Sequence, residues 1–532
     1  MIVAARRRIG DHLQHFDVLV SGCGPTGGVL SNLLAAQGLS VCVVERFPEV
    51  YPTPRAIVLD WEAMRTLQYC GVARTLFPST RSHPGTDFLG VDGEIIKLFD
   101  PAPPPYALGW PSTSTFVQPE LEKMLRRALS LRANVTMKLG CTVTGFAEDS
   151  ARVVVTIADN ATGASETATA TFLVGCDGAN SEIRKRLGFN LEDYRFDEWW
   201  IVIDAWQLCD TELPRKTTQY CWPSRPATYV VGPGNLRRWE IKLLAQESPA
   251  EFDDPARVRA VMANYVDIRC FDIWRSATYR FAARVGDRWA SRRVFLAGDA
   301  VHQMPPFLGQ GLCAGLRDAF NLAWKLVLAQ RHGGSDILLS TYETERKPHV
   351  AKVIQHAKEF GLIIGEMDEA RARERDRILL AELREGRMTT TRQAFIPDLT
   401  NGILTNDQLS GSLMVQPEVV SSGRTRLMDD ICPMAFLYVT ANPAAQTWME
   451  PHADAWRRIG GQRIVIQSSA GSVPDGVVAL VEAGDIFARW AAANDTAAVV
   501  VRPDRYVYAT VQDENDLTHK LKRLDGQLGL VD

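Results

Sequence analysis

The residues with the clearest chemistry are glycines near the N-terminus. Gly22, Gly24 and Gly27 form a G-x-G-x-x-G pattern, with Pro25 and Thr26 between them. Glycines at this spacing permit a tight turn, a close approach of backbone to a phosphate, and close packing of a helix on a sheet. A helix that begins there also offers free N–H groups to an anion. The pattern predicts binding of a dinucleotide pyrophosphate.

The segments around these glycines follow the order that such a site needs. An apolar run of strand length, 16–20, precedes them, and a helix-like segment, 28–37, follows and ends at Gly38. A second apolar strand, 41–44, leads directly into Glu45. An acidic residue at this place accepts hydrogen bonds from ribose hydroxyls. The pattern by itself does not choose between NAD and FAD.

Two later segments repeat the theme of a strand that ends in glycine and aspartate. The run 172–181 is a strand that ends in an Asp-Gly turn at Asp177, and the strand 293–297 ends in Gly298 and Asp299. A helix that continues to about residue 329 follows, with apolar residues on one face. Its approach and first turn contain His302, Pro306, Gly309, Gln310, Gly311 and Leu312.

These three motifs, in this order, resemble the group A flavoprotein aromatic hydroxylases of the para-hydroxybenzoate hydroxylase and phenol hydroxylase type. The resemblance covers about residues 16–365. It implies an enzyme that uses FAD, NADH or NADPH, and O2 to hydroxylate a small aromatic substrate through a flavin C4a-hydroperoxide. The chain has no second dinucleotide fingerprint, so we expect the nicotinamide to dock transiently, and the preference between NADH and NADPH stays open.

The resemblance also assigns cofactor contacts to this chain. It implies that Glu45 binds the adenosine ribose, that Asp299 holds the ribityl chain, and that the backbone of 309–312 faces the N1/O2 edge of the flavin. That last assignment has an independent reason, because a helix N-terminus stabilises the negative charge of a reduced flavin. Further implied contacts come from Arg55 near the pyrophosphate, Gln118 on the flavin side, Asp177 toward FAD and nicotinamide, and Arg46, which forms either a pyrophosphate contact or a surface ion pair.

Between residues 194 and 288 the pattern changes to short alternating strands at 200–206, 218–222, 228–231 and 239–243. This predicts a mostly antiparallel sheet inserted into the nucleotide-binding fold, which in the family forms a wall of the substrate pocket. The stretch 219–240 resembles the 3-(3-hydroxyphenyl)propionate hydroxylase branch. Alternatives are a fused or nitrogen-containing aromatic substrate, a flavin dehydrogenase or oxidase, and a non-catalytic nucleotide-binding protein.

Three residues are candidates for catalysis. Tyr220, with Trp222 and Arg225 nearby, is placed either in the pocket wall or in cross-strand packing. His302 either relays a phenolic proton or is a structural histidine beside the flavin loop. Pro306 is expected to stiffen that loop. Many relatives have Asn where this chain has Cys313, so one side-chain contact is expected to be absent.

The last third has a different character. Residues 366–397 are rich in Arg, Glu and Ala and predict a helical connector. Residues 398–532 resemble the thioredoxin-like C-terminal domain of the phenol hydroxylase branch, with the segment V-R-P-D-R-Y-V-Y at 501–508. They lack a dithiol, so we expect a structural role and a homodimer. Strands are predicted at 435–439, 463–466 and 497–501, and a helix at 514–524 that stops at Gly526.

Length, charge and cysteine content exclude several classes of protein and of binding site. The chain has 532 residues, a net charge of −4 and ten cysteines without a C-x-x-C pair, which argues against a nucleic-acid binder, a metal site or a dithiol redox site. No apolar run approaches membrane-spanning length, and the cysteines suit a reducing cytoplasm. The predicted fold is α/β. A short extension (1–15) precedes a discontinuous FAD-binding Rossmann-like domain (16–193 and 289–365), the inserted sheet (194–288), the connector and the C-terminal domain.

Overall fold

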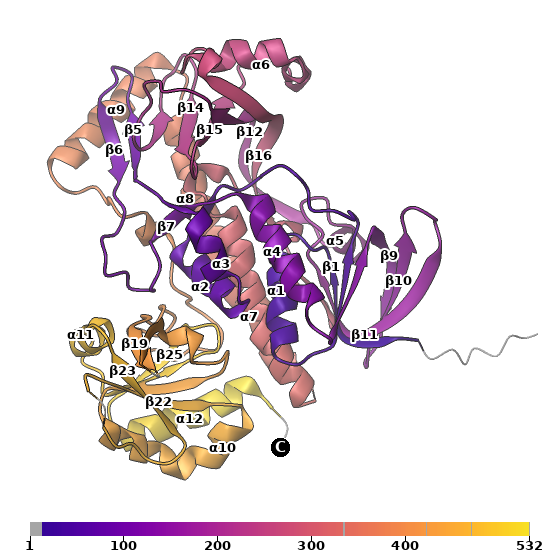
Figure 1. Cartoon of the computed structure of the whole chain (residues 1–532), viewed down its shortest axis with the longest axis vertical. Helices are drawn as coiled ribbons and strands as arrows, with labels where there is room; N and C mark the ends of the chain where they lie inside the picture. Colours follow the sequence, from indigo (N-terminus) through magenta and orange to yellow (C-terminus); the bar gives the residue numbers. More distant parts are fainter. Residues whose placement is uncertain (1–12, 334–335, 422, 470, 531–532) are drawn as a thin grey trace, which may run out of the picture.

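The computed structural model describes residues 13–333, 336–421, 423–469 and 471–530. Most of the expected extension, 1–12, lies outside these residues. Figure 1 shows three bodies: a sheet with helices at the top, a nucleotide-binding body in the centre and right, and the C-terminal domain at the lower left.

The nucleotide-binding body is built on a seven-stranded sheet with a parallel core. Its order is β8-β2-β1-β11-β10-β9, with β17 beside β11, and β9 and β10 are antiparallel to their neighbours. The apolar runs of the sequence form the central strands because both faces of a parallel sheet are covered. The strands are β1 (His15–Ser21), β2 (Val41–Glu45), β8 (Val135–Leu139), β9 (Cys141–Glu148), β10 (Val153–Asp159), β11 (Ser165–Gly175) and β17 (Val294–Leu296).

Helices cover this sheet and carry the nucleotide-binding turns. Helix α1 packs against α7 and α4, and α7 packs against α2 and α8. A three-stranded sheet of β3 (Val58–Asp60), β7 (Thr113–Thr115) and β4 (Arg81–Ser82) lies beside them. The helices are α1 (Pro25–Ala36), α2 (Trp61–Tyr69), α3 (Ala73–Leu76), α4 (Gln118–Ser130), α5 (Glu182–Arg186), α7 (Gly311–Arg331) and α8 (Asp336–Gly365).

The inserted sheet has eight strands in the order β18-β16-β12-β15-β14-β13-β5-β6. All neighbours are antiparallel except β13 and β5, which confirms a mostly antiparallel sheet. Its members are β5 (Thr86–Leu89), β6 (Ile95–Phe99), β12 (Leu191–Gln207), β13 (Thr217–Tyr220), β14 (Ala227–Val231), β15 (Leu236–Lys242), β16 (Phe271–Gly286) and β18 (His302–Gln303), and α6 (Pro255–Met262) packs on it.

This sheet is larger than residues 194–288 predicted. Strands β5 and β6 come from the segment expected within the nucleotide-binding body, and β18 comes from its second part. The strand expected at 200–206 is only the last part of β12, which begins at Leu191. Strand β16 was not predicted, because its exposed polar positions interrupt the apolar alternation.

The C-terminal domain has a mixed seven-stranded sheet in the order β20-β19-β23-β22-β21-β24-β25. Strands form at all three predicted places, as β21, β22 and β24. The predicted stop at Gly526 is wrong: α12 continues to Leu528, and Gly529 ends it with φ +54°. The elements are β19 (Glu418–Ser421), β20 (Arg424–Leu427), β21 (Leu437–Thr440), β22 (Gln462–Gln467), β23 (Val477–Glu482), β24 (Ala498–Val501), β25 (Val507–Val511), α10 (Ala453–Arg458), α11 (Ile486–Ala493) and α12 (Glu514–Leu528).

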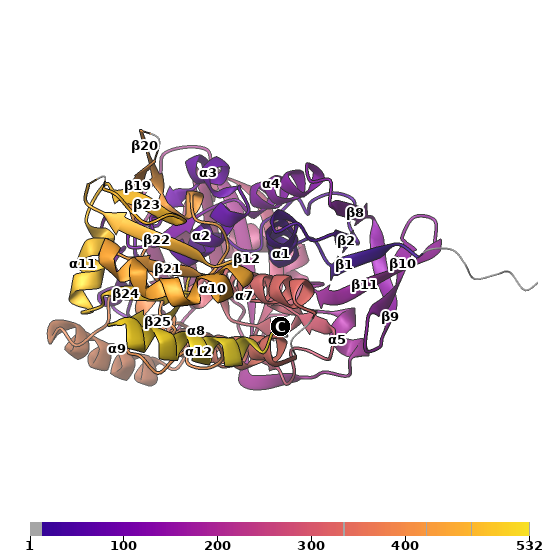
Figure 2. The same ribbon diagram turned by 90° about the horizontal axis from the view of Figure 1, so that it is seen from below.

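The C-terminal domain packs against the nucleotide-binding body through buried ion pairs (Figures 1 and 2). Arg502 binds Glu345 of α8 at 2.7 Å, and Asp504 accepts a hydrogen bond at 3.0 Å from the indole of Trp324 on α7. Arg505 meets Asp429 within its own domain at 3.1 Å. The connector between the two bodies contains helix α9 (Glu369–Arg384) and a short 3-10 turn (Arg392–Phe395).

Two of the ten cysteines, Cys209 and Cys270, form a disulfide, which the cysteine pattern of the sequence did not predict. The pair lies 61 residues apart in sequence but only 5.2 Å apart between Cα atoms, because Gln207 at the end of β12 pairs with Phe271 at the start of β16. None of the helices in the described part of the chain is long and apolar enough to cross a membrane. Over the same residues, no group of His, Cys, Asp and Glu has the arrangement of a metal site.

Candidate active site

The three glycine motifs come together at the carboxyl ends of the parallel strands. Gly22 has φ +102°, and a Cβ there would lie 2.3 Å from the carbonyl oxygen of Cys176 in the second motif. A Cβ on Gly298 or Gly315 would lie 2.6 or 2.4 Å from the hydroxyl oxygen of Thr26. Only glycine permits these approaches, so the third motif and helix α7 close directly onto the first.

The first motif fits a pyrophosphate. Gly24 is the N-cap of α1 and Pro25 occupies the first turn, where its missing N–H costs nothing. A Cβ on Gly27 would lie 2.0 Å from the carbonyl oxygen of Gly22, whereas one on Gly24 would meet nothing within 4 Å. The space in front of Gly24 therefore lies open at the positive end of the α1 dipole.

Glu45 is buried at the end of β2 and holds the glycine loop. Its carboxylate accepts hydrogen bonds from the N–H of Cys23 at 2.7 Å and of Phe47 at 2.9 Å. The neighbouring Arg46 is exposed, stacks on the Phe47 ring at 4.9 Å, and forms no ion pair among the described residues. The guanidinium of Arg46 is thus free to meet a phosphate.

Gln118 holds the backbone of the neighbouring segment 55–58. Its Oε1 accepts the N–H groups of Arg55 at 3.0 Å and Ala56 at 2.6 Å, and its Nε2 donates to Glu122 at 2.7 Å. The carbonyl oxygen of Arg55 accepts a 2.8 Å hydrogen bond from Arg238 of the inserted sheet. Gln118 and Arg238 together shape the 55–58 segment, and the exposed Arg55 side chain extends from it.

Two carboxylates offer acceptors to a bound cofactor. Asp177 Oδ2 accepts from the N–H groups of Glu182 at 2.8 Å and Ile183 at 3.2 Å, while its Oδ1 is buried and has no partner among the described residues. Asp299 follows β17 and its side chain is exposed. The buried, unpaired Oδ1 of Asp177 is costly, so this oxygen and the exposed carboxylate of Asp299 fit a ligand with several hydroxyls, as FAD has.

The loop before α7 is rigidly held. Residues 306–308, beginning at Pro306, form a 3-10 turn, Gly309 has φ +63°, and Gln310 is the N-cap of α7. The ring of Phe307 packs against Trp200 of β12 at 5.1 Å between centroids. Gly311 and Leu312 form the first turn of α7, whose free N–H groups suit the negatively charged edge of a reduced flavin.

Cys313 and Arg392 both contact the loop before α7, and the sequence did not predict the contact of Arg392. The buried thiol of Cys313 lies 3.9 Å from the carbonyl oxygens of Val58 and Gly309, and burial raises its pKa. Arg392 of the connector donates to the carbonyl oxygen of Leu308 at 3.1 Å, and its Nη1 is buried without a partner among the described residues. Burial lowers the pKa of Arg392 to about 10. No motif marks Arg392, because only the return of the connector places it here.

His302 is buried beside Asp318, which supports the structural one of its two expected roles. Its side chain is 1% exposed, and its Nε2 lies 2.7 Å from Asp318 Oδ2. Asp318 also accepts from the N–H of Gly298 at 3.0 Å and from Arg346 at 2.8 Å. His302 therefore helps to fix the Gly298–Asp299 turn through Asp318.

The aromatic candidates on β13 lie on the outer face of the inserted sheet. Tyr220 packs against Trp222 at 4.6 Å and Tyr265 at 5.3 Å between ring centroids, in the apolar cluster covered by α6. Arg225 makes two 2.8 Å hydrogen bonds to Glu247. The structure gives these residues a packing role away from the flavin loop.

The opposite, inner face supplies an apolar wall beside residues 55–58, named the flavin-binding segment because the resemblance assigns Arg55 to FAD. Leu236 and Val230 pack against Ile57 and Val58, together with Val117, Trp206 and Trp274. The two tryptophan rings stack at 5.2 Å between centroids. Such a wall suits the face of an aromatic substrate and excludes water.

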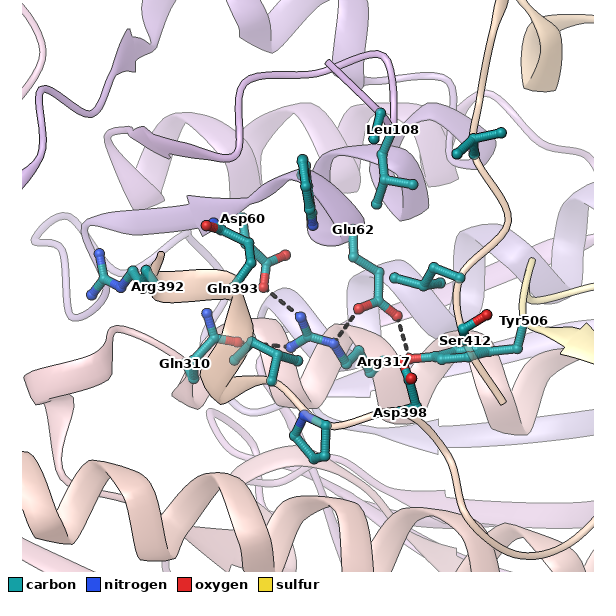
Figure 3. A pocket seen from close by; sticks show the side chains of 16 residues that line it. Asp60, Glu62, Leu108, Gln310, Arg317, Arg392, Gln393, Asp398, Ser412 and Tyr506 are labelled. Atoms are coloured by element: carbon teal, nitrogen blue, oxygen red, sulfur yellow. Dashed lines mark hydrogen bonds and ion pairs between the residues drawn. The ribbon is translucent and has the colours of Figure 1, made fainter. Parts of the chain in front are cut away.

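A cavity of about 240 Å³ lies between the flavin loop, α2 and the C-terminal domain (Figure 3). Within it, Arg317 of α7 donates to Gln310 Oε1 at 2.8 Å and pairs with Asp60 and Glu62. The hydroxyl of Tyr506 donates to Glu62 at 2.7 Å. This network joins the C-terminal domain to the loop before α7, which the resemblance assigns to the flavin edge.

The FAD binding domain family matches residues 15–357, and the HcaD C-terminal domain matches residues 411–527. The chain belongs to the FAD binding domain family. The region that matches contains all three glycine motifs and the inserted sheet.

Relatives match over nearly the whole chain. A probable NADH-specific resorcinol 4-hydroxylase of Rhodococcus jostii is 36% identical over 516 residues, covering 96% of this chain and 94% of the relative. The 3-(3-hydroxy-phenyl)propionate/3-hydroxycinnamic acid hydroxylase 2 of Burkholderia vietnamiensis is 31% identical, covering 94% of each. The solved structure of the flavin-dependent monooxygenase PieE with FAD and substrate aligns with a TM-score of 0.81 at 20% identity, covering 97% of this chain and 99% of PieE.

The chain is thus a group A flavin-dependent aromatic hydroxylase. The predictions of FAD, of a nicotinamide co-substrate and of the α/β fold with an inserted sheet are confirmed. The assignments of individual site residues remain proposals, supported by the contacts described above.

Proposed function

We propose that this enzyme hydroxylates a phenol that carries a second substituent in the meta position. The observation that carries the proposal is the likeness, over nearly the full chain, to relatives named for resorcinol and for 3-(3-hydroxyphenyl)propionate. Both compounds are phenols substituted at the meta carbon. A ring activated by a hydroxyl group is the electron-rich substrate that a flavin monooxygenase needs.

Bound FAD, reduced by a nicotinamide, supplies the activated oxygen. The chain holds and shields the reactants. The first turn of α7 stabilises negative charge at the flavin edge, and Pro306 and Phe307 keep the loop in place. The apolar wall around Val58 and Leu236 orients the ring and keeps out water, which would otherwise divert the oxygen to peroxide.

The charges on the inner face favour resorcinol over an acidic phenylpropanoid. Arg238 and Arg275 are buried arginines of this face, and both bind Asp204, at 2.7 and 3.1 Å. A propionate side chain would find neither of these guanidinium groups free. A second, neutral hydroxyl group needs no such partner.

We also propose a homodimer in the cytoplasm. The resemblance to the phenol hydroxylase branch supports the dimer, and the need for NADH or NADPH supports the location. Light scattering after gel filtration measures the oligomeric state, and a mass of one chain would overturn the dimer.

The test compares NADH and NADPH oxidation by the yellow, purified protein in air, with resorcinol, with 3-(3-hydroxyphenyl)propionate and without substrate. We expect resorcinol to stimulate oxidation and to gain one hydroxyl group whose oxygen comes from labelled O2. Stimulation that yields only hydrogen peroxide, or no stimulation by any phenol, would contradict the proposal. Fused and nitrogen-containing aromatics serve as the comparison series.

A further inference from the structure

The register of the inserted sheet determines which side chains face the flavin loop. Side chains alternate between the two faces of a strand, so residues 236, 238, 240 and 242 of β15 share one face. At one end of this row, Leu236 packs on Val58 of the flavin-binding segment. At the other end, Lys242 pairs with Trp200, whose ring contacts Phe307 of the flavin loop. Positions 238 and 240 therefore lie between two contacts with the flavin site.

Glu240 occupies one of these two positions. It pairs with Val202 on β12 and with Thr228 on β14, and its residue surface is only 6% exposed. No described residue donates a hydrogen bond to its carboxylate. The nearest cation is Arg238, with its Nη1 3.8 Å away and already bonded to the carbonyl oxygen of Arg55. A buried carboxylate without a donor is costly, and a ligand hydroxyl at this position would supply one.

The groups around Glu240 balance in charge. Asp204 of β12, Arg238 of β15 and Arg275 of β16 face it, which makes two carboxylates and two guanidinium groups. Burial raises the pKa of Glu240 to about 7, with Arg238 and Arg275 opposing the rise and Asp204 adding to it. A carboxyl group with this pKa takes up and returns a proton near neutral pH.

We propose that Glu240 accepts the phenolic proton of the substrate. The O–H bond of the phenol breaks, a Glu240 carboxylate oxygen forms the new O–H bond, and the phenolic oxygen keeps the electron pair. The negative charge then spreads into the ring and makes its carbon atoms better nucleophiles for the oxygen that reduced FAD activates. The proton returns to the phenolic oxygen when the product forms. This inference rests on the proposed function only in taking a phenol as substrate.

The experiment measures kcat/KM for resorcinol against pH in the holoenzyme and in Glu240→Gln. In the parent enzyme, kcat/KM is expected to rise with pH through about 7, as Glu240 loses its proton. In Glu240→Gln, we expect kcat/KM to fall about a hundredfold, because the amide cannot accept a proton. We also expect the rise of kcat/KM with pH through about 7, which we call the pH limb, to disappear. The matched control is Glu198→Gln. Glu198 lies in the same sheet and binds Lys242 at 2.7 Å, so its loss is expected to leave the limb in place.

A second measurement needs no turnover. Phenol binding to the oxidised holoenzyme, followed by the flavin absorption change, is expected to weaken below pH 7 in the parent and to be weak and pH-independent in Glu240→Gln. A retained pH step in the Gln variant would overturn the inference. If resorcinol is not hydroxylated, but the pH dependence of phenol binding disappears in Glu240→Gln, the substrate proposal fails and the role of Glu240 stands. Should Glu240→Gln lose FAD, Glu240→Asp replaces it. That variant is expected to keep a shifted limb, and a flat profile with full FAD content would also overturn the inference.

Discussion

Tyr506 is predicted to hold the C-terminal domain to the flavin loop through one hydrogen bond. Its hydroxyl donates to Glu62 at 2.7 Å in a buried network, and burial raises its pKa so that it stays protonated and able to donate. Tyr506→Phe removes only this donor and leaves a buried carboxylate oxygen without it. A hydrogen bond to a charged group contributes about 1.5–3 kcal/mol, so the variant is expected to lose roughly that much stability.

The matched control is Tyr508→Phe in the same segment. The hydroxyl of Tyr508 donates to the carbonyl oxygen of Lys520 at 3.2 Å, which is a neutral bond within the C-terminal domain. Its loss is expected to cost about 1 kcal/mol. Denaturant unfolding, followed by tryptophan and by flavin fluorescence, compares the two variants. Because Arg317 links Glu62 to Gln310, flavin release is expected to move to lower denaturant in Tyr506→Phe only.

Equal losses in the two variants, or an unchanged flavin transition in Tyr506→Phe, would refute the network as the link between domain and loop. A double variant gives an independent check. If Tyr506 acts through Gln310, then Tyr506→Phe combined with Gln310→Met is expected to cost less than the sum of the two single changes.

Three further outcomes follow from the structure. Gly22→Ala is expected to yield a colourless protein, because its Cβ would lie 2.3 Å from the Cys176 carbonyl oxygen at φ +102°; retained flavin absorbance would contradict this. Gly24→Ala, whose Cβ meets nothing within 4 Å, is expected to fold normally and to bind FAD at least about tenfold more weakly, as judged by fluorescence titration. Burial opposes the charge of Glu345, but Arg502 and Lys325 lower its pKa to about 2. Because its pKa is depressed in the folded state, Glu345 stabilises the fold above its ordinary pKa of 4.5, and this stabilisation is lost as pH falls toward 2. Limited proteolysis is therefore expected to release the C-terminal domain between pH 4.5 and 2. A C-terminal domain that resists proteolysis over this range would contradict the prediction.

The nucleotide-binding half was predictable because its signals are local. The turn at Gly22, the open approach at Gly24 and the acidic end of β2 at Glu45 each follow from a few adjacent residues. Their conformational requirements allow few alternatives, since only glycine tolerates φ +102° against a neighbouring carbonyl group. The order of the three motifs resembles that of the group A hydroxylases, and this resemblance implied FAD.

The inserted sheet was predictable as a class but not in detail. Its strands alternate, yet nothing local shows that β5 and β6 join it or which face meets the flavin. A shift of one residue along a strand moves a side chain to the other face of the sheet. On β13, Gln219 lies on the inner face and Tyr220 on the outer face. On β15, Glu240 lies on the inner face and Trp239 on the outer face. The aromatic residues drew attention because they are conspicuous, whereas a single glutamate is not.

By itself, the sequence determined the turn geometry of the first glycine motif, because that geometry depends on a few adjacent residues. Through the resemblance of its three motifs to the group A hydroxylases, it also indicated the cofactor and the reaction class. Only the tertiary structure decided that His302 is bonded to Asp318, that Arg392 returns to the flavin loop, and that Tyr506 reaches Glu62 from 444 residues away. Contacts of that separation depend on how whole elements pack, and the local spacing of side-chain types along the chain does not reveal that packing.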